Sequence, residues 1–483
     1  MLARSLVPLL LTTLCGVVAP ASAADDPGRD EARDALRRAG RFFAKEVALR
    51  GGYVYFVELD RPRRWGEGEA TATQIWVQPP ATPTVGEAFL NAYEATGDAP
   101  HLAAATAAGE ALVYGQLKSG GWTNRIDFDP NGNPADYRNG RGRGRNTSSL
   151  DDGQTPAALR LLIRLDAAHD GRHAAIAEAV RTGLDALLAA QFPGGGFPQV
   201  WDDPEDPPPT LRAVLPEGDW RELPRVKNYW DQATLNDGLA GQVVDTLLLA
   251  RTTYLEREPP LAERCDAAVR RLGDFLIRAQ LPRPQPAWAQ QYDAKMRPAW
   301  ARIFEPPAVV TSESQDVIEA LLTLHAATGD PQFLDPIPAA LDYLDRSALP
   351  DGQLPRYLEL NTNRPLYMQR DGGGYRPTFD DTNLPGHYGW KIGSRVETLR
   401  NKLQRAQSGR PPSPPNAVKL ADAARRAIDA LDDEGRWVET SDGSKLVGQA
   451  KIPVGSRFLA SETFADNMSA LAAFLRVDAP APR

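Results

Sequence analysis

One stretch of the sequence, residues 288–307, concentrates side chains that act on charged or sugar-like substrates. It reads WAQQYDAKMRPAWARIFEPP and holds three Trp or Tyr residues, one Lys, two Arg, one Asp and one Glu in twenty positions. A core helix does not need this mixture, and large aromatic side chains are seldom left in a solvated linker. We therefore interpret the stretch as the wall of a site. Within it, Arg302 lies between Trp300 and Phe304 and close to Glu305.

Two other stretches place carboxylates where helices are expected to start. Asp-Asp-Gly at 151–153 precedes the apolar run PAALRLLIRL, and Asn-Asp-Gly at 236–238 precedes LAGQVVDTLLLA. Taken singly, Asp151 and Asp237 fit helix N-caps that interact with the helix dipole. If both starts point at one place, they instead offer the oxygen ligands that Ca²⁺ prefers. Zinc is not indicated, because the chain has five histidines and no C-x-x-C, and its H-x-x-x-H at 169–173 spans the turn expected at Gly171.

Arginines and aromatic residues complete the set of candidate site residues. Arg364 lies in Asn-Thr-Asn-Arg-Pro at 361–365, and Arg370 follows six residues later. A guanidinium binds a sugar carboxylate through two parallel hydrogen bonds, although either arginine also suits a structural salt bridge. Trp288 and Tyr292 suit stacking on sugar faces and suit a core equally well as single residues. By pattern alone, such a site fits a carbohydrate-active enzyme and also a polysaccharide-binding protein.

The elements that must position these residues are helical hairpins in series. Strand signals are scarce, and Ala/Leu-rich segments recur with shared punctuation. Gly97, Gly171 and Gly329 each stand where a helix end needs a positive φ. Long loops start near glutamines 116, 191 and 280. About five antiparallel hairpins predict an all-α fold, an (α/α) toroid, complete or incomplete, with long loops that line a central cleft.

The N-terminus predicts export. Arg4 precedes an apolar run over 7–18, and Ala-Ser-Ala at 21–23 is a cleavage signal. This is typical of a signal peptide over 1–23, with an apolar run too short to span a membrane. The protein is thus expected to be secreted or periplasmic, with no membrane span. We expect a toroid domain over 24–399, a Pro-rich linker over 400–415 and a C-terminal helical segment over 416–483 that packs on the toroid.

Charge and cysteine content narrow the classes of partner. The formal net charge is −8, which argues against nucleic acid as a partner. An anionic substrate then requires local arginines or a metal to reverse the field at the site. Cys265 is the single cysteine left after the predicted cleavage, so no intramolecular disulfide forms and the fold depends on a large core. We expect a monomer.

Several motifs occur in one order that resembles a known family. They are DDGQT at 151–155, PGGGFPQ at 193–199, LND at 235–237, the stretch 288–307, SES at 312–314 and TNRP at 362–365. This set resembles pectate lyases of the pectic acid lyase type, polysaccharide lyase family ten. The resemblance covers residues 147–370, and Gly-Gly-Trp at 120–122 agrees with it. The chain departs from the family pattern at Asp152 (Asn in the family), Gln154 (Ala), Leu235 (Phe) and Ala289 (often Cys).

The resemblance implies an (α/α)₃ toroid that cleaves polygalacturonate, an acidic polysaccharide, by β-elimination with Ca²⁺ (a carbon–oxygen lyase of the EC 4.2.2.2 type). It implies that Arg302, in the context W-A-R-x-[YF]-E, is the catalytic base. It also implies that Asp151 and Asp237 approach Ca²⁺ and that Arg364 binds a substrate carboxylate. The further substrate-binding residues that we expect are Arg370, Tyr292, Asp293, Asn236 and Trp288.

The chemistry explains why such groups are needed. Elimination removes the C5 proton, which lies α to the uronate carboxylate, and expels the O4 glycoside. A cation and Arg364 would neutralise the carboxylate, and a base must lie within hydrogen-bond reach of C5. A guanidinium has an ordinary pKa above about 12, so the base role of Arg302 rests on the resemblance. A nearby cation would lower that pKa, and an acidic neighbour such as Glu305 would raise it.

Two other functions remain open from the sequence. A glycoside hydrolase on an α/α toroid needs two carboxylates that flank the scissile bond, and Asp151 and Asp237 could form such a pair. A non-catalytic polysaccharide-binding protein needs the same arginines and aromatic residues. The pattern Gln-x-x-x-Gly-Gly-Trp at 116–122 is also similar to repeats of triterpene cyclases, but the chain has no D-x-D-D motif for their acid.

Overall fold

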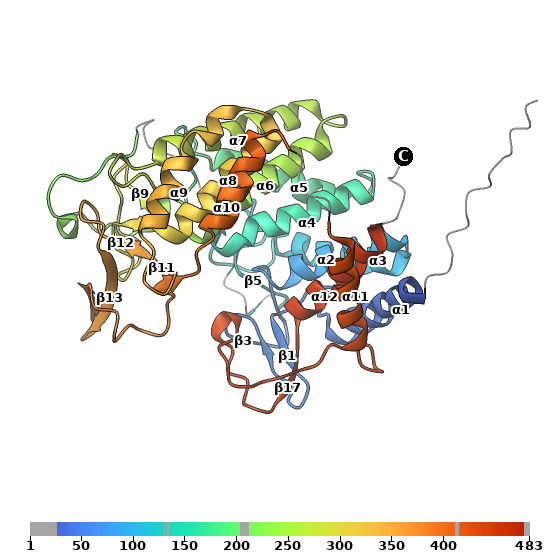
Figure 1. The fold of residues 1–483 in the computed structure, drawn as a ribbon. Helices are drawn as coiled ribbons and strands as arrows, with labels where there is room; N and C mark the ends of the chain where they lie inside the picture. Colours follow the sequence, from blue (N-terminus) through green and yellow to red (C-terminus); the bar gives the residue numbers. More distant parts are fainter. Residues whose placement is uncertain (1–26, 130, 133–134, 203–211, 411–414, 478–483) are drawn as a thin grey trace, which may run out of the picture.

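The computed structural model describes residues 27–129, 131–132, 135–202, 212–410 and 415–477. Within these ranges the chain forms an all-α (α/α) toroid, which confirms the predicted fold class (Figure 1). The inner helices are α2 (Thr82–Thr96), α4 (Gln154–Ala168), α6 (Leu239–Tyr254), α8 (Thr311–Thr328), α10 (Val396–Gln407) and α12 (Ser461–Arg476). The outer helices are α1 (Pro27–Phe42), α3 (Ala99–Gly115), α5 (Ala174–Ala189), α7 (Pro259–Ala279), α9 (Ile337–Arg346) and α11 (Ala417–Asp429).

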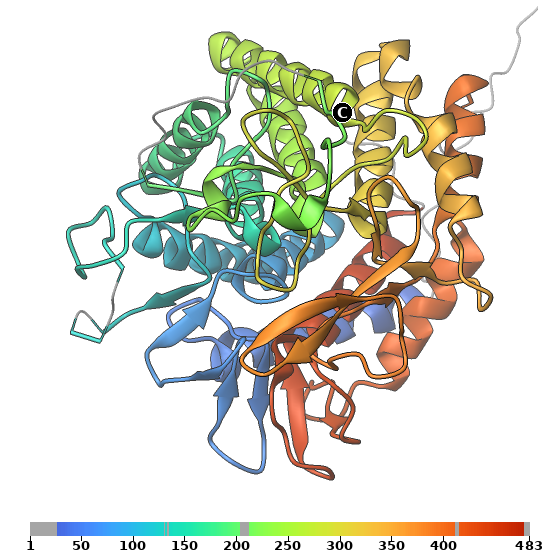
Figure 2. The same ribbon diagram turned by 90° about the vertical axis from the view of Figure 1, so that its left-hand side faces the viewer.

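The inner helices contact one another in the order α12–α2–α4–α6–α8–α10, and α2, α4, α6 and α8 each pack against the outer helix that follows in the chain. Short turns join inner to outer helices, and Gly97, Gly171 and Gly329 adopt φ values of 73°, 70° and 71° there, as the sequence predicts. Long loops lead from each outer helix to the next inner helix. These loops gather at one end of the toroid, which Figure 2 brings toward the viewer. The starts of α4, α6 and α8 therefore face this loop-bearing end.

Short antiparallel strands connect the long loops to one another. One sheet has the order β16 (Glu439–Thr440), β17 (Arg457–Ala460), β1 (Phe56–Glu58), β2 (Arg64–Trp65), β3 (Glu69–Ala70). Another has the order β10 (Val309–Val310), β12 (Tyr357–Leu358), β13 (Pro365–Asp371), β14 (Gly374–Thr378). The two-stranded pairs are β4 (Gln74–Trp76) with β5 (Arg125–Asp127), β6 (Ser148–Ser149) with β7 (Val200–Trp201), β8 (Ala233–Thr234) with β9 (Gln291–Tyr292), and β11 (Leu354–Pro355) with β15 (Lys391–Ile392). The sequence did not predict them, because most are too short for an alternating pattern.

The C-terminal helices are part of the toroid. Helix α12 packs against α1, α2 and α11, and β17 pairs with β1. Phe464 stacks on Phe43 with 3.9 Å between ring centroids. The predicted linker over 400–415 is wrong for its first half, because residues 400–407 belong to α10, which packs on α8 and α9 through buried Leu403. The Pro-rich composition that suggested a linker starts only at 411, where residues 411–414 lie outside the described ranges.

The predicted signal peptide over 1–23 also lies outside the described residues. Over the described ranges, no helix has the combination of length and apolarity needed to cross a bilayer. Cys265 is buried in α7 as a free thiol, and burial raises its pKa to about 12.

Glutamine side chains attach the long loops to the outer helices. Gln116, fully buried, donates from Nε2 to the carbonyl of Gly120 in its own loop (2.8 Å) and to that of Ala179 in α5 (2.9 Å). Gln191 and Gln280 make the same pair of bonds in the next two loops. Each glutamine thus donates to one carbonyl of its own loop and to a second carbonyl in or at the start of the next outer helix, which ties the loop to that helix.

Replacement of one such glutamine should destabilise the whole toroid. Gln116→Ala removes two buried hydrogen bonds and takes the side-chain donor away from the Gly120 carbonyl, so we expect the free energy of unfolding to fall by about 2–4 kcal/mol. The exposed Gln332 provides a control, and Gln332→Ala should change stability by less than about 0.5 kcal/mol. Urea denaturation followed by circular dichroism measures both. Equal stability of the two variants would contradict the structural role of Gln116.

Candidate active site

Two acidic turns of the same shape start α4 and α6. Residues 151–153 and 236–238 each form one 3₁₀ turn directly before the helix. Asp152 and Asp237 adopt left-handed conformations, with φ values of 47° and 51°, and each is followed by a left-handed glycine. Aspartate is among the few residues with a side chain that enter this region readily. In the two turns, Asp151 corresponds to Asn236, and Asp152 corresponds to Asp237.

The carboxylates of the two turns converge. Asp151, Asp152 and Asp237 each place one oxygen within 4.8 Å of the others. Asn236 lies between them and donates from Nδ2 toward Asp237 Oδ2 and, at 3.5 Å, toward Asp151 Oδ1. The N-cap interpretation is wrong for both turns, because Gly153 and Gly238 occupy the N-cap positions and no side chain caps either helix.

The donor set fits a hard cation such as Ca²⁺. Three carboxylates and an amide supply oxygen atoms, which Ca²⁺ prefers over nitrogen or sulfur. Asn236 is 3% exposed, and its Oδ1 finds no hydrogen-bond partner among the described residues. A buried acceptor without a donor, beside three negative groups, is a position at which a cation improves the local electrostatics. We refer to Asp151, Asp152, Asn236 and Asp237 as the acidic cluster.

The mutual repulsion in the acidic cluster appears in its titration. Desolvation raises the pKa of Asp152 to about 6, and the charges of Asp151 and Glu67 contribute. Desolvation also raises the pKa of Asp237 to about 8, with contributions from Asp152, Asp151 and Glu313. Both residues retain contact with solvent. The charge of Arg302 opposes both shifts, so this guanidinium lies within electrostatic range of the cluster.

Arg302 is held by its own loop. Its Nη2 lies 2.8 Å from Glu305 Oε1, and its backbone N–H donates to Glu305 Oε2 at 2.9 Å. The side chain of Glu305 is 1% exposed, whereas that of Arg302 is 41% exposed. Burial alone would lower the pKa of Arg302, but the hydrogen bond and charge of Glu305 raise it above its ordinary value. In the described state, Arg302 is therefore a protonated guanidinium that reaches solvent.

Residues that the sequence did not single out extend this arrangement. The hydroxyl of Tyr388 donates to Glu305 Oε1 at 3.0 Å and accepts from Arg356 Nη1 at 3.1 Å. Arg356 also lies 3.8 Å from Glu313 Oε1, and the charge of Asp237 helps to raise its pKa. Glu313 belongs to the quoted SES motif, so its role was accessible from the sequence. Tyr388 and Arg356 carried no comparable signal.

Two of the predicted substrate-binding residues are part of the core. Trp288 and Tyr292 are 0% and 1% exposed. The indole Nε1 of Trp288 donates to Leu276 O at 2.7 Å, and the Tyr292 hydroxyl donates to Ala279 O at 2.6 Å. Rings buried in this way cannot stack on a polysaccharide. The prediction of substrate stacking is wrong for both, and the structure assigns them to the attachment of the 288–307 loop to α7.

Of the other predicted substrate-binding residues, Asp293 is engaged within its own loop, whereas Arg364 and Arg370 are exposed. Asp293 accepts from Arg297 Nε and Nη2 at 2.9 and 2.7 Å, so its carboxylate orders a turn of the loop. Arg364 is exposed, with its guanidinium 3.3 Å above the ring of Phe379. Arg370 is exposed on β13. Desolvation lowers the pKa of a nearby histidine, residue 387, and the charges of Arg370 and Arg302 both lower it further. Arg370 and Arg302 thus both lie within electrostatic range of this histidine.

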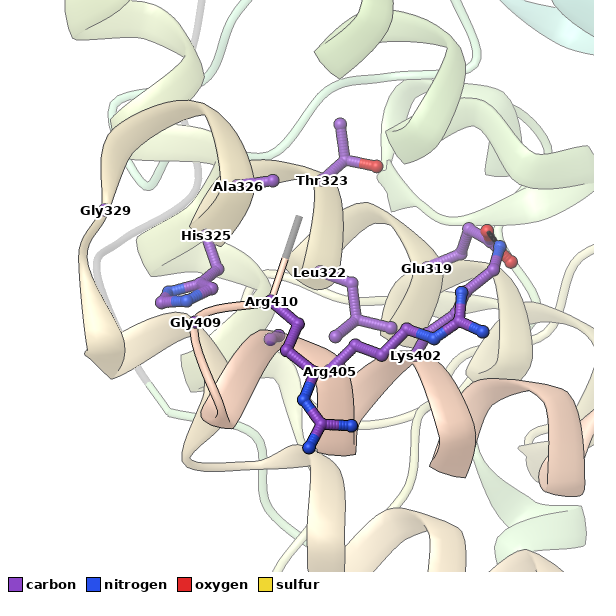
Figure 3. Close-up of a pocket in the computed structure, with 11 residues that line it drawn as sticks. Glu319, Leu322, Thr323, His325, Ala326, Gly329, Lys402, Arg405, Gly409 and Arg410 are labelled. Atoms are coloured by element: carbon purple, nitrogen blue, oxygen red, sulfur yellow. Dashed lines mark hydrogen bonds and ion pairs between the residues drawn. The ribbon is translucent and has the colours of Figure 1, made fainter. Parts of the chain in front are cut away.

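The acidic cluster is separate from the cavity that Figure 3 shows. This cavity, of about 560 Å³, lies between the C-terminal halves of α8 and α10. It is lined by apolar Leu322 and by the cationic side chains of Lys402, Arg405 and Arg410. Lys402 already pairs with Glu319. None of the predicted site residues lines this cavity, so it does not belong to the candidate active site.

Comparison with known proteins gives the family. The sequence model of the family described as pectic acid lyase matches residues 116–384, which is more than half of the chain. The chain belongs to the pectic acid lyase family. This confirms the resemblance that the motifs indicated, and it identifies the chain as a member of a family of polysaccharide lyases. A comparison with curated proteins gives no match.

Solved structures with similar folds include other members of this class. A family 10 polysaccharide lyase from Cellvibrio cellulosa is 21% identical, with 68% of this chain and 97% of that chain covered and a TM-score of 0.47. An aspartate-to-alanine mutant from the same organism, in complex with trigalaturonic acid, is 20% identical over 67% and 98% of the two chains, with a TM-score of 0.47. A cellobiose 2-epimerase from Spirochaeta thermophila is 15% identical over 80% and 99%, with a TM-score of 0.43. With these low scores, the family assignment rests on the sequence match.

The raised pKa values of this lyase predict how its stability depends on pH without a bound cation. An unfolded aspartate has a pKa near 3.9, whereas Asp152 and Asp237 titrate near 6 and 8 in the folded state. Between about pH 4 and 8 the folded state binds more protons, so its stability falls as pH rises. Asp237→Asn removes the larger shift and should give a higher melting temperature at pH 8 and a flatter pH dependence.

Thermal unfolding in EDTA at a series of pH values measures this effect. Asp170→Asn is the matched control, because Asp170 is also left-handed (φ 51°) but lies at the opposite end of α4. If Asp237→Asn destabilises the protein at pH 8 as much as at pH 5, the desolvation of Asp237 and the repulsion around it are not the cause of the pH dependence.

Proposed function

We propose that the protein is a secreted or periplasmic pectate lyase that cleaves polygalacturonate by calcium-assisted β-elimination. The observation that carries the proposal is the convergence of three carboxylates within electrostatic range of Arg302, which belongs to the family-matched loop. A cation site and a guanidinium next to each other suit a polymer in which every sugar carries a carboxylate. The N-terminal pattern over 1–23 supports export.

Asp151 and Asp237 would hold Ca²⁺, which when bound neutralises a uronate carboxylate and so makes the adjacent C5 proton more acidic. The exposed guanidinium groups of Arg364 and Arg370 would orient further carboxylates of the polymer. These roles concern binding and orientation, and they need no covalent intermediate. The C5 proton leaves to a base, the C4–C5 double bond forms, and O4 departs with the rest of the polymer.

Arg302 would be the base that accepts the C5 proton. It is the exposed member of a pair whose acidic partner, Glu305, is buried, so its guanidinium is the group available to substrate. The ion pair favours the protonated form, which means that Arg302 must lose a proton before it acts. Glu305 therefore sets how alkaline the solution must be for turnover. Tyr388 donates a hydrogen bond to Glu305 and so stabilises the charged form of its carboxylate.

The geometry counts against a glycoside hydrolase. The acidic cluster places its carboxylate oxygens within 4.8 Å of one another. Acid and nucleophile or base in glycosidases are separated by about 5–9.5 Å, so that a sugar bond fits between them. The convergence of three carboxylates on one point suits a shared cation better than a pair set apart as acid and nucleophile.

Replacement of Arg302 tests the proposed function directly. In Arg302→Ala, we expect kcat on polygalacturonate to fall by about 100-fold or more, because general-base catalysis is lost. Binding of oligogalacturonate should remain within about tenfold of that of the unmodified protein. The assay is the absorbance of the 4,5-unsaturated product, with isothermal titration for binding. Lys295→Ala is the control, because Lys295 is exposed in the same loop. Full turnover by Arg302→Ala would place the base elsewhere.

Glu305→Gln tests the protonation of Arg302. The amide keeps the shape of the side chain but removes the charge that raises the pKa of Arg302. The acidic limb of the pH profile of kcat/KM should therefore shift to lower pH. Glu263→Gln, on the exposed surface of α7, provides the control for a change of one charge. An acidic limb that does not move would show that Arg302 is not the titrating group.

A further inference from the structure

We propose that Asp152 is a third carboxylate ligand of the cation and that Gln78 holds it in position. This inference rests on the proposed function, in which a cation binds at Asp151 and Asp237. It concerns the residue at which this chain departs from its family pattern, where Asp replaces Asn. The departure adds a full negative charge at the centre of the acidic cluster.

The first reason is the repetition of the turn. Asp152 occupies the position in the first turn that Asp237 occupies in the second, and the two φ values differ by only a few degrees, at 47° and 51°. Each residue is followed by a left-handed glycine and then by an inner helix. Because the two turns have the same backbone conformation, they direct the two side chains in the same way. A turn that brings Asp237 to the cation therefore also brings Asp152 to it. Their carboxylate oxygens do meet within 4.8 Å.

The second reason is how the carboxylate of Asp152 is held. Gln78 donates from Nε2 to Asp152 Oδ2 at 2.8 Å and to Glu67 Oε1 at 3.2 Å. Gln154 donates to Gln78 Oε1 at 3.4 Å, so the amide of Gln78 is oriented on both sides. One oxygen of Asp152 is thereby fixed, and the other remains for a cation. Ligands of metals in proteins are commonly oriented by outer hydrogen bonds of this kind.

The third reason is independent of the carboxylates. The amide of Asn236 lies between Asp151 and Asp237, and the residue is only 3% exposed. Within the described part of the chain, no donor reaches its Oδ1. Buried amide oxygens are almost always paired. An unpaired one next to three like-charged groups indicates that a positive ligand belongs in this cluster.

The extra carboxylate has two opposite consequences. Affinity for Ca²⁺ rises with the number of charged ligands, so Asp152 should strengthen binding relative to asparagine at this position. Without the cation, the same charge repels its neighbours and destabilises the folded state. A change from Asp to Asn should therefore weaken cation binding and stabilise the cation-free protein at once. A residue with a purely structural role would not show these two effects together.

The test is titration of Ca²⁺ into full-length Asp152→Asn by isothermal titration calorimetry. We expect a Kd at least about tenfold weaker than that of the unmodified protein. The melting temperature in EDTA should rise, and the further increase on addition of Ca²⁺ should shrink. Asparagine tolerates the left-handed conformation, so the variant should fold. Gln78→Ala keeps every ligand charge and should also weaken binding, by about tenfold.

Two further variants separate this inference from the proposed function. Asp170→Asn makes the same change in another left-handed aspartate, at the far end of α4, and should leave the Kd unchanged. Asp151→Asn should abolish measurable Ca²⁺ binding if the cation site is as proposed. Loss of binding in Asp151→Asn with a normal Kd in Asp152→Asn would overturn the role of Asp152 alone. A normal Kd in both would overturn the cation site and with it this inference.

Discussion

The repulsion among Asp151, Asp152 and Asp237 is the constraint on which the candidate site depends. Like charges this close separate unless the backbone prevents it, and here two left-handed turns at rigid helix starts prevent it. A bound cation would relieve this repulsion, and the charge of Arg302 already opposes it. The close carboxylates lower the stability of the folded state, and the packing of the rest of the toroid offsets this loss, as is common at functional sites.

The toroid supplies that support through interactions far from the cluster. Gln116, Gln191 and Gln280 fix three of the long loops to the next outer helix, and short strands join neighbouring loops. Trp288 and Tyr292 anchor the loop of Arg302 to α7 from inside the core. Because these contacts are buried and satisfied, the loop end of the toroid is held rigidly although it carries most of the polar site residues.

The sequence predicted the helical hairpins because their signals are local. A glycine such as Gly97 marks a helix end through its own φ, and the motif around Arg302 is contiguous. It could not decide between core and surface for Trp288, since an aromatic residue suits both. Gln78 and Tyr388 were missed for another reason: they lie in loops distant in sequence, outside the motifs, and only tertiary packing brings them to Asp152 and Glu305.

The central claim is that this member of the pectic acid lyase family eliminates across polygalacturonate with the help of Ca²⁺. The most direct measurement is the absorbance of the 4,5-unsaturated product formed by the unmodified protein, first in EDTA and then after Ca²⁺ is restored. We predict no increase in absorbance in EDTA and a steady increase once Ca²⁺ is present. The absence of any unsaturated product with Ca²⁺ present would contradict the proposed lyase activity, and equal rates in both conditions would contradict the role of the cation.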